Sequence, residues 1–316
     1  MAYKMKSAFG FLLAVACSAV IGMEFYKQMS IAKREQKSIR MLQEADLSVY
    51  WVGPQLYKLN CLTRKWESIP QTDNIVAMHS QDVDICNQII FYSDFWKEHI
   101  LCAEPLPDKT KNTPVEFSIR VLGTKKVSHD CEKIAYQRYL DDGCTQCICV
   151  FYLKENQEKR LLNIESIDSL DWSHTDESIF YSVGGRIYMV DVQTSVSTYV
   201  TDGYWVSCLS DNEIAFCRTV AQGDKYYKAA YRYDLDKQTL KEVFRTRHFI
   251  LGMNWDSSGR YVFAVLEILR LRFLIIPDVQ FLPVVWDTET GERYDLPRIY
   301  GKSGCILPVN NQSSQQ

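Results

Sequence analysis

Short apolar runs separated by polar turns make up most of the chain. From Ser48 onward these runs are interrupted by turn-forming Gly, Asp, Asn and Ser residues. The pattern over residues 55–59 and 187–190 has the two-residue period of a strand. Aromatic residues, which suit a pleated surface, make up 13% of the chain. The pattern therefore predicts an all-β body.

A strand, a polar turn and a second strand form a unit that recurs along the chain. Residues 171–182 (DWSHTDESIFYS) and 254–263 (NWDSSGRYVF) are two copies, and residues 206–216 are a degraded third copy. Trp172 and Trp255 in the first two copies are separated by close to two periods of about 40–45 residues, the length of one propeller blade. The spacing predicts a ring of repeated β units.

An Asp or Asn followed three residues later by Thr marks a second recurring unit. Side-chain oxygens of Asp and Asn accept hydrogen bonds from backbone amides at the start of a turn. Each copy follows apolar residues, as expected for the turn of a β-hairpin. The copies are Asn60 with Thr63, Asp191 with Thr194, Asp236 with Thr239, and Asp287 with Thr290.

The two units together resemble the TolB-like, WD40-like repeat, in which a W-S-P-D-G turn is followed by G-x-I-Y-x-x-D and then by Thr and Gly. Residues 171–194 match this repeat over a whole blade, and residues 254–292 match it with a long insertion. The resemblance covers residues 165–296 and implies an all-β fold, a β-propeller of about six four-stranded blades. The blades are expected at residues 48–75, 76–116, 117–164, 165–203, 204–247 and 248–298.

The first predicted blade is one strand short. We expect residues 304–309, near the end of the chain, to supply it and to close the ring, because closure removes exposed sheet edges. The propeller would then span residues 48–309, followed by a disordered polar tail over residues 310–316. Cys61 and Cys305 would share this blade, which makes them a candidate disulfide.

The first 23 residues are predicted to be a signal anchor or signal peptide. Residues 7–23 carry no charge, and a membrane span needs roughly 20 apolar residues. Three interpretations compete: an uncleaved anchor, a cleaved secretory signal, and a bacterial lipoprotein signal with Cys17 as the lipidated residue. The apolar run continues past Cys17, which favours the anchor.

Residues 24–47 are predicted to form a helical stalk. They are polar, contain neither Pro nor Gly, and show little core-facing stripe, so we expect a spacer between membrane and body. Lys4 and Lys6 precede the apolar run, which favours an extracytoplasmic body on the periplasmic or secretory side. Further basic residues follow the run, so the orientation stays open.

Cys144, Cys147 and Cys149 form the densest cysteine cluster. Such spacing occurs in redox and zinc sites, but here it leads into a strand instead of opening a helix. His129 and Cys131 would have to complete a zinc site, and their spacing fits no standard pattern. The favoured interpretation is structural. The even number of cysteines outside the apolar segment is compatible with disulfides and equally with buried thiols.

Residues 266–282 are an apolar insertion where a short hairpin is expected. One interpretation is a long strand pair that extends beyond the blade. The other is a contact surface for a partner or the membrane, because exposed apolar patches mark interaction sites. The candidate contact residues are Leu269, Phe273, Ile275 and Phe281.

No catalytic motif accompanies the repeats. The sequence contains neither a G-x-S-x-G elbow nor a phosphate-binding loop, and no cofactor is expected. With a net charge of −3, the folded region is not strongly basic, so nucleic acid is not an expected partner. Acidic residues at a channel mouth are the candidates for an enzyme: Asp171, Asp176, Asp256 and Glu267.

The sequence favours a membrane-tethered propeller that acts as a protein-binding or scaffold module. The TolB resemblance implies a protein or peptide partner, within an envelope complex. The alternative is a propeller enzyme, a lyase or hydrolase, with its site at the channel mouth. A third interpretation is an inhibitor or immunity-type partner.

Overall fold

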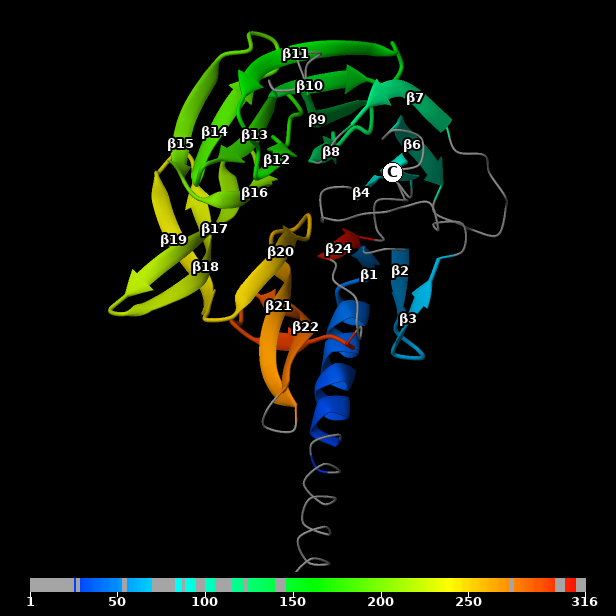
Figure 1. Cartoon of the computed structure of the whole chain (residues 1–316), viewed down its shortest axis with the longest axis vertical. Coiled ribbons are helices and arrows are strands. Elements are labelled where there is room, and N and C mark those ends of the chain that lie inside the picture. Colours follow the sequence, from blue (N-terminus) through cyan, green and yellow to red (C-terminus); the bar gives the residue numbers. More distant parts are fainter. Residues whose placement is uncertain are drawn as a thin grey trace, which may run out of the picture.

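Six four-stranded antiparallel sheets surround a common centre in the computed structural model (Figure 1). The structure describes residues 26, 29–52, 56–69, 83–86, 89–94, 100–105, 115–121, 124–139, 146–272, 276–298 and 305–310. The number of sheets confirms the prediction of a six-bladed propeller. The predicted boundary at residue 116 is wrong, because the last strand of the second sheet continues to Arg120.

The sheets are numbered here as blades 1 to 6 in chain order. Blade 1 is β1 (Leu47–Val52), β2 (Leu56–Asn60), β3 (Lys65–Ser68) and β24 (Cys305–Asn310); blade 2 is β4 (Val83–Cys86), β5 (Ile89–Asp94), β6 (Ile100–Pro105) and β7 (Val115–Arg120); blade 3 is β8 (Lys125–Val127), β9 (Lys133–Tyr139), β10 (Gln146–Tyr152) and β11 (Gln157–Ile164). Blade 4 is β12 (Ser169–Trp172), β13 (Ser178–Val183), β14 (Arg186–Asp191) and β15 (Ser197–Asp202); blade 5 is β16 (Tyr204–Ser210), β17 (Glu213–Gln222), β18 (Lys225–Asp234) and β19 (Thr239–Thr246); blade 6 is β20 (Phe249–Trp255), β21 (Tyr261–Arg272), β22 (Ile276–Asp287) and β23 (Arg293–Asp295).

The end of the chain closes the ring. β24 pairs with β1 along its whole length, from Leu47 opposite Asn310 to Val52 opposite Cys305. β24 also contacts β20 and β21 of blade 6, so it joins the first blade to the last. The prediction that the tail strand completes the first blade is therefore confirmed.

The repeated tryptophans fill the spaces between blades. Trp172 is fully buried and packs in a cluster with Ile148 and Val150 of the preceding blade. Trp255 is also buried, and its cluster includes Ala215 and Cys217 of blade 5. The repeat is visible in the sequence because every blade must present a large apolar group to its neighbour.

A helix over residues 29–44 leads into β1 and packs against the propeller (Figure 1). Ile39, Met41 and Leu42 are buried in a cluster that contains Trp51 and Phe263 of blades 1 and 6. This apolar face holds the last turns of the helix on the ring. The expectation of little core-facing stripe is therefore wrong for Ile39, Met41 and Leu42, while the spacer between membrane and body stays a prediction.

Polar contacts fix the same helix to blade 6. Ser38 Oγ donates to the backbone oxygen of Asp295 at 2.6 Å, and Lys37 forms an ion pair with Glu292 at 2.8 Å. Within the described part of the chain, no helix is both long and apolar enough to cross a membrane. Residues 7–23 and Cys17 lie outside the described residues, so the anchor and lipidation interpretations stay predictions.

Candidate functional site: a charged cluster on the inner strands

Three inner strands place charged side chains side by side. Asp84 lies on β4, Lys126 on β8 and Asp171 on β12, and β8 contacts both β4 and β12. Lys126 Nζ lies 3.3 Å from Asp84 Oδ1, and the backbone N–H of Val127 donates to Asp84 Oδ2 at 2.8 Å. One carboxylate thus joins blade 2 to blade 3.

Asp171 joins blade 4 to blade 5 in the same way. Its Oδ2 accepts a hydrogen bond from the backbone N–H of Cys208 at 2.9 Å. Ser169 Oγ accepts another from the backbone N–H of Val206 at 2.8 Å. These polar side chains replace backbone pairing between blades, because adjacent blades share no sheet ladder.

Electrostatics bind Lys126 to both carboxylates. Burial acts to lower the pKa of Lys126, but Asp84 and Asp171 outweigh it and hold this pKa above its ordinary value. Burial raises the pKa of Asp171, and the Lys126 ammonium opposes that rise. The side chain of Lys126 keeps 35% of its surface exposed, whereas that of Asp84 keeps 10%. Lys126 therefore keeps part of its side chain in contact with solvent, whereas Asp84 is almost enclosed.

Replacing Asp84 with Ala is expected to lower the free energy of unfolding by about 2–3 kcal/mol. The change leaves the buried N–H of Val127 without its acceptor and removes the hydrogen-bonded partner of Lys126. Denaturant unfolding measures the loss. The control is Asp211→Ala, because Asp211 is exposed in the turn between β16 and β17 of blade 5. Equal unfolding midpoints for the two variants would contradict the prediction.

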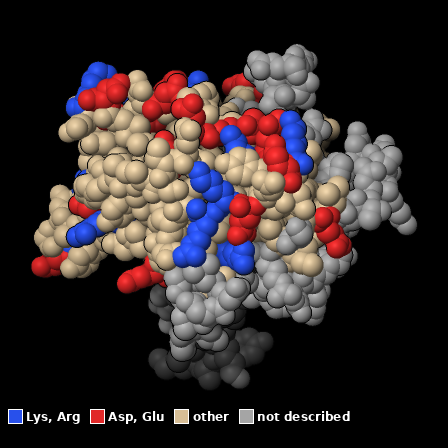
Figure 2. Space-filling model, turned by 90° about the horizontal axis from the view of Figure 1, so that it is seen from above, with Lys and Arg blue, Asp and Glu red and all other residues tan. Residues whose placement is uncertain are grey.

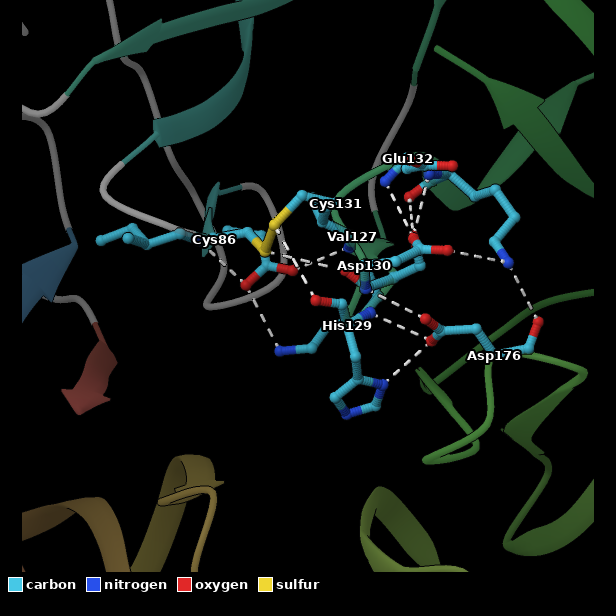
Figure 3. Close-up of a disulfide and its surroundings, with 12 residues drawn as sticks. Cys86, Val127, His129, Asp130, Cys131, Glu132 and Asp176 are labelled. Carbon is cyan, nitrogen blue, oxygen red and sulfur yellow. Dashed lines mark hydrogen bonds and ion pairs between the residues drawn. A yellow bond between two sulfur atoms is a disulfide. The ribbon is translucent and has the colours of Figure 1, made fainter. Parts of the chain in front are cut away.

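A disulfide between Cys86 and Cys131 links blades 2 and 3 beside this cluster (Figure 3). Their Cα atoms are 6.2 Å apart, and they are separated by 45 positions in the sequence. Cys86 ends β4, and Cys131 lies in the turn between β8 and β9. Sequence reasoning missed this pair; the separation is close to one blade period, which is compatible with neighbouring blades but does not single out these two cysteines.

The predicted disulfide between Cys61 and Cys305 is wrong, because Cys61 is a free thiol. Both residues belong to blade 1, as expected, but at opposite ends of β1. Cys305 is opposite Val52 at the end of β1, whereas Cys61 follows β2, which runs back towards the start of β1. Sharing a blade is not enough to bring two thiols together.

Asp176 anchors the turn that carries Cys131 (Figure 3). Its Oδ1 accepts hydrogen bonds from the backbone N–H of His129 at 3.0 Å and contacts His129 Nδ1 at 2.9 Å, while Oδ2 accepts from Asp130 N–H at 3.1 Å. Asp176 has a positive φ of 56° and is buried in the first turn of blade 4. The predicted turn residue thus also fastens blade 3 to blade 4.

The His129–Asp176 pair is expected to make stability depend on pH. Its hydrogen bond to Asp176 raises the pKa of His129 above 6.5. Although burial acts in the opposite direction, bonds from His129 and Asp130 lower the pKa of Asp176 below 3.8. The pair therefore stabilises the fold most between these values. Its contribution is lost as pH rises through the raised pKa of His129, and also in acid as Asp176 is protonated.

Urea unfolding at pH 5 and pH 8 tests this dependence with the variant His129→Gln. The wild type should lose stability relative to the variant on going to pH 8, by less than about 1 kcal/mol because solvent screens a half-exposed imidazole. His248→Gln is the control, since His248 is exposed elsewhere. An equal difference at both pH values would contradict the assignment.

The histidines form a solvent-facing rim next to Lys126. The rings of His129 and His174 are 5.4 Å apart, and both residues are exposed. His174 lies in the turn between β12 and β13. Blades 2, 3 and 4 are therefore fastened together beneath a surface that presents two imidazoles beside the partly exposed side chain of Lys126.

Two cysteines of the predicted cluster are part of the hydrophobic core. Cys147 and Cys149 are buried in a cluster between blades 2 and 3, with their sulfur atoms 3.4 Å apart, and burial raises the pKa of the Cys149 thiol. Cys144 lies outside the described residues, and Cys131, proposed as a further ligand, is in the disulfide. Among the described residues, no group of three or more His, Cys, Asp or Glu could hold a metal ion.

The remaining acidic candidates lie in blade 6. Asp256 accepts hydrogen bonds from the backbone N–H of Tyr261 at 2.6 Å and of Ser258 at 3.2 Å, so it organises its own turn. Glu267 lies on β21 opposite Phe249. The structure thus brings Asp171 and Asp176 to adjoining parts of one site and leaves Asp256 and Glu267 in another blade.

The apolar insertion forms a long hairpin of β21 and β22, as the first interpretation predicted. Phe281 is partly buried against the cluster that contains the helix residues Ile39 and Leu42. Phe273 and Ile275 lie outside the described residues, and Leu269 lies on β21 with its side chain not described. At least one of the four candidate contacts therefore packs on the protein's own core.

Charges of both signs lie close together on the face shown in Figure 2. Several exposed residues form ion pairs, such as Arg138 with Glu158 at 2.6 Å and Lys237 with Asp234 at 2.8 Å. Exposed pairs of this kind contribute little stability. No field of a single sign covers this face.

Comparison with solved structures shows the fold. TolB from Acinetobacter baumannii superposes with a TM-score of 0.60 at 16% identity, over 83% of this chain and 65% of that one. A proposed TolB from Agrobacterium tumefaciens gives 0.58 at 12% identity, over 84% and 98%. An oligogalacturonate lyase in complex with manganese gives 0.56 at 10% identity, over 86% and 88%.

The chain thus spans less than two thirds of the length of the Acinetobacter protein. Neither protein-family models nor curated proteins give a match. At these identities the likeness shows a TolB-type propeller fold, as the repeat resemblance implied.

Proposed function

We propose that this TolB-type propeller is a membrane-tethered binding module that holds a protein or peptide segment at the rim formed by Lys126, His129 and His174. The observation that carries the proposal is that covalent and hydrogen-bonded links between blades hold this rim in place. A disulfide and two buried carboxylates fasten three blades beneath it. A surface held this rigidly loses little conformational entropy when a partner binds.

The chemistry of the rim favours a segment with carboxylate groups. The Lys126 ammonium uses one of its three donors on Asp84, and the side chain of Lys126 stays partly exposed. His129 and His174 add imidazole nitrogens that can donate hydrogen bonds. The carboxylate of an acidic side chain or of a chain's C-terminus would therefore find hydrogen-bond donors on two adjacent blades, blade 3 and blade 4.

The tether and the compartment complete the proposal. The uncharged segment over residues 7–23 would anchor the chain, and the helix over residues 29–44 would place the propeller beside the membrane. The Cys86–Cys131 disulfide supports an oxidising, extracytoplasmic location, because such bonds persist mainly there.

Affinity purification of the full chain from detergent-solubilised membranes tests the function. His174→Glu places a negative charge on the exposed rim and should abolish recovery of the partner. His248→Glu is the matched control on an exposed turn elsewhere, and it should recover the partner like the wild type. Equal recovery by both variants would place the binding surface elsewhere.

The enzyme alternative has its own outcome. Two results together would favour the enzyme: the wild-type chain recovers no stable partner, and elemental analysis shows stoichiometric Mn²⁺ in the purified chain. The protein would then be interpreted as a metal-dependent lyase or hydrolase. Asp171 and Asp176 would then be the first residues to substitute. Their oxygens already accept backbone hydrogen bonds, which is why the binding function is preferred.

A further inference from the structure

The outermost strand of blade 4 differs from the other outer strands in charge. β15 has the sequence STYVTD, and its one charged residue, Asp202, is the last. β3, β7, β11, β19 and β23 each carry at least two charged residues. Charged side chains on edge strands prevent pairing with other chains. β15 lacks that protection along its length.

The edge of β15 is open to solvent. In the sheet order β12-β13-β14-β15 it pairs, among the described strands, with β14 alone, and it lies at the rim of the ring (Figure 1). Tyr199 is 56% exposed, and Val196, immediately before the strand, is 60% exposed. A register shift near Val200 bends the strand, but the outer strands β7, β11 and β19 have similar shifts. Charge is therefore the feature that sets β15 apart.

The backbone of this strand has a defined outward side. Asp191 N–H donates to the Val196 oxygen, so the polar backbone groups of Val196 face β14. These groups alternate in direction along an antiparallel strand. The N–H and C=O of Ser197 and Tyr199 therefore face outward, and those of Thr198 face β14.

We propose that β15 pairs with β15 of a second copy of this chain, antiparallel, about a two-fold axis at Thr198. This register sets Ser197 opposite Tyr199 of the second copy and forms four backbone hydrogen bonds between outward-facing groups. It also sets Thr198 opposite its own copy and Val196 opposite Val200, pairs that stabilise sheets. No charge faces a like charge. The segment is thus complementary to itself, as a two-fold interface requires.

The interface is small, so the dimer is weak. Pairing of one short strand buries less than the roughly 1,000 Å² of a stable interface, which points to a Kd on the order of 0.1 mM. Sedimentation equilibrium of the full chain in detergent should show a monomer–dimer equilibrium in that range. A monomer at millimolar concentration would overturn the proposal.

Cysteine cross-linking tests the register. Thr198 would form a non-hydrogen-bonded pair with its copy, with Cα atoms about 4.5 Å apart, which suits a disulfide. Mild oxidation of Thr198→Cys should therefore give a covalent dimer. Thr239→Cys, on the charged outer strand β19, is the matched control and should remain monomeric. Equal yields from the two variants would overturn the two-fold pairing.

Lysine substitution tests the edge without cross-linking. Thr198→Lys sets two ammonium groups opposite each other on the axis and should abolish dimerisation, whereas Thr239→Lys should leave it unchanged. Thermal unfolding should be similar for both variants, because both residues are exposed. If Thr198→Lys still dimerises, or if Thr198→Cys links to another protein and not to itself, the second copy is the wrong occupant of this edge.

Discussion

Deletion of residues 305–316 is expected to abolish cooperative folding. β24 supplies the innermost strand of blade 1 and pairs with every residue of β1. Without it, β1 becomes an edge strand that carries the fully buried Trp51 and Val49, and blades 1 and 6 lose the strand that joins them. Ring closure is what removes edges in a propeller, so the damage extends beyond one strand.

Denaturant unfolding followed by circular dichroism measures this effect. The truncated chain should show a broad transition of small amplitude, and a peptide with the sequence of residues 305–316, added in trans, should restore part of the wild-type signal. Removal of residues 311–316 alone is the control and should leave the midpoint unchanged. A truncated chain that unfolds at the wild-type midpoint would show that the ring is stable when open.

The sequence predicts the blades well because each blade repeats the same local chemistry. A buried Trp, a polar turn and an Asp or Asn before Thr recur at a spacing set by the fold. Asp191 accepts hydrogen bonds from the backbone N–H and the hydroxyl of Thr194, as the turn motif implies. Closure was predictable too, because a blade one strand short needs a strand from elsewhere in the chain.

Contacts between blades are less visible in the sequence. Asp84, Lys126 and Asp171 lie on different blades, and their proximity depends on how the inner strands meet at the centre. The docked face of the helix is short, with Ile39, Met41 and Leu42 as its apolar residues. In the sequence it therefore resembles a polar stalk, because the residues of blades 1 and 6 that cover this face are not adjacent in the chain. Similarly, a disulfide partner follows from three-dimensional position, which residue spacing alone does not give.

Loss of the Cys86–Cys131 disulfide is expected to lower the free energy of unfolding by about 4 kcal/mol in the chain-entropy description. The bond closes a loop between residues separated by 45 positions, so it restricts the unfolded chain strongly. The variant Cys86→Ser with Cys131→Ser, measured by denaturant unfolding, tests this. Cys61→Ser is the control, because Cys61 is a free, partly exposed thiol, and it should change stability little.

The same variant shows whether the disulfide also acts in the folded state. Asp84 and the disulfide both connect β4 to the β8 region. If the bond acts through the unfolded chain, the costs of Asp84→Ala and of the cysteine replacement should add within about 0.5 kcal/mol. That is the expected result, because the carboxylate holds Val127 through its own hydrogen bond. A coupling above about 1 kcal/mol would instead mean that the disulfide positions the inner strands, and with them the rim that is proposed to bind a partner.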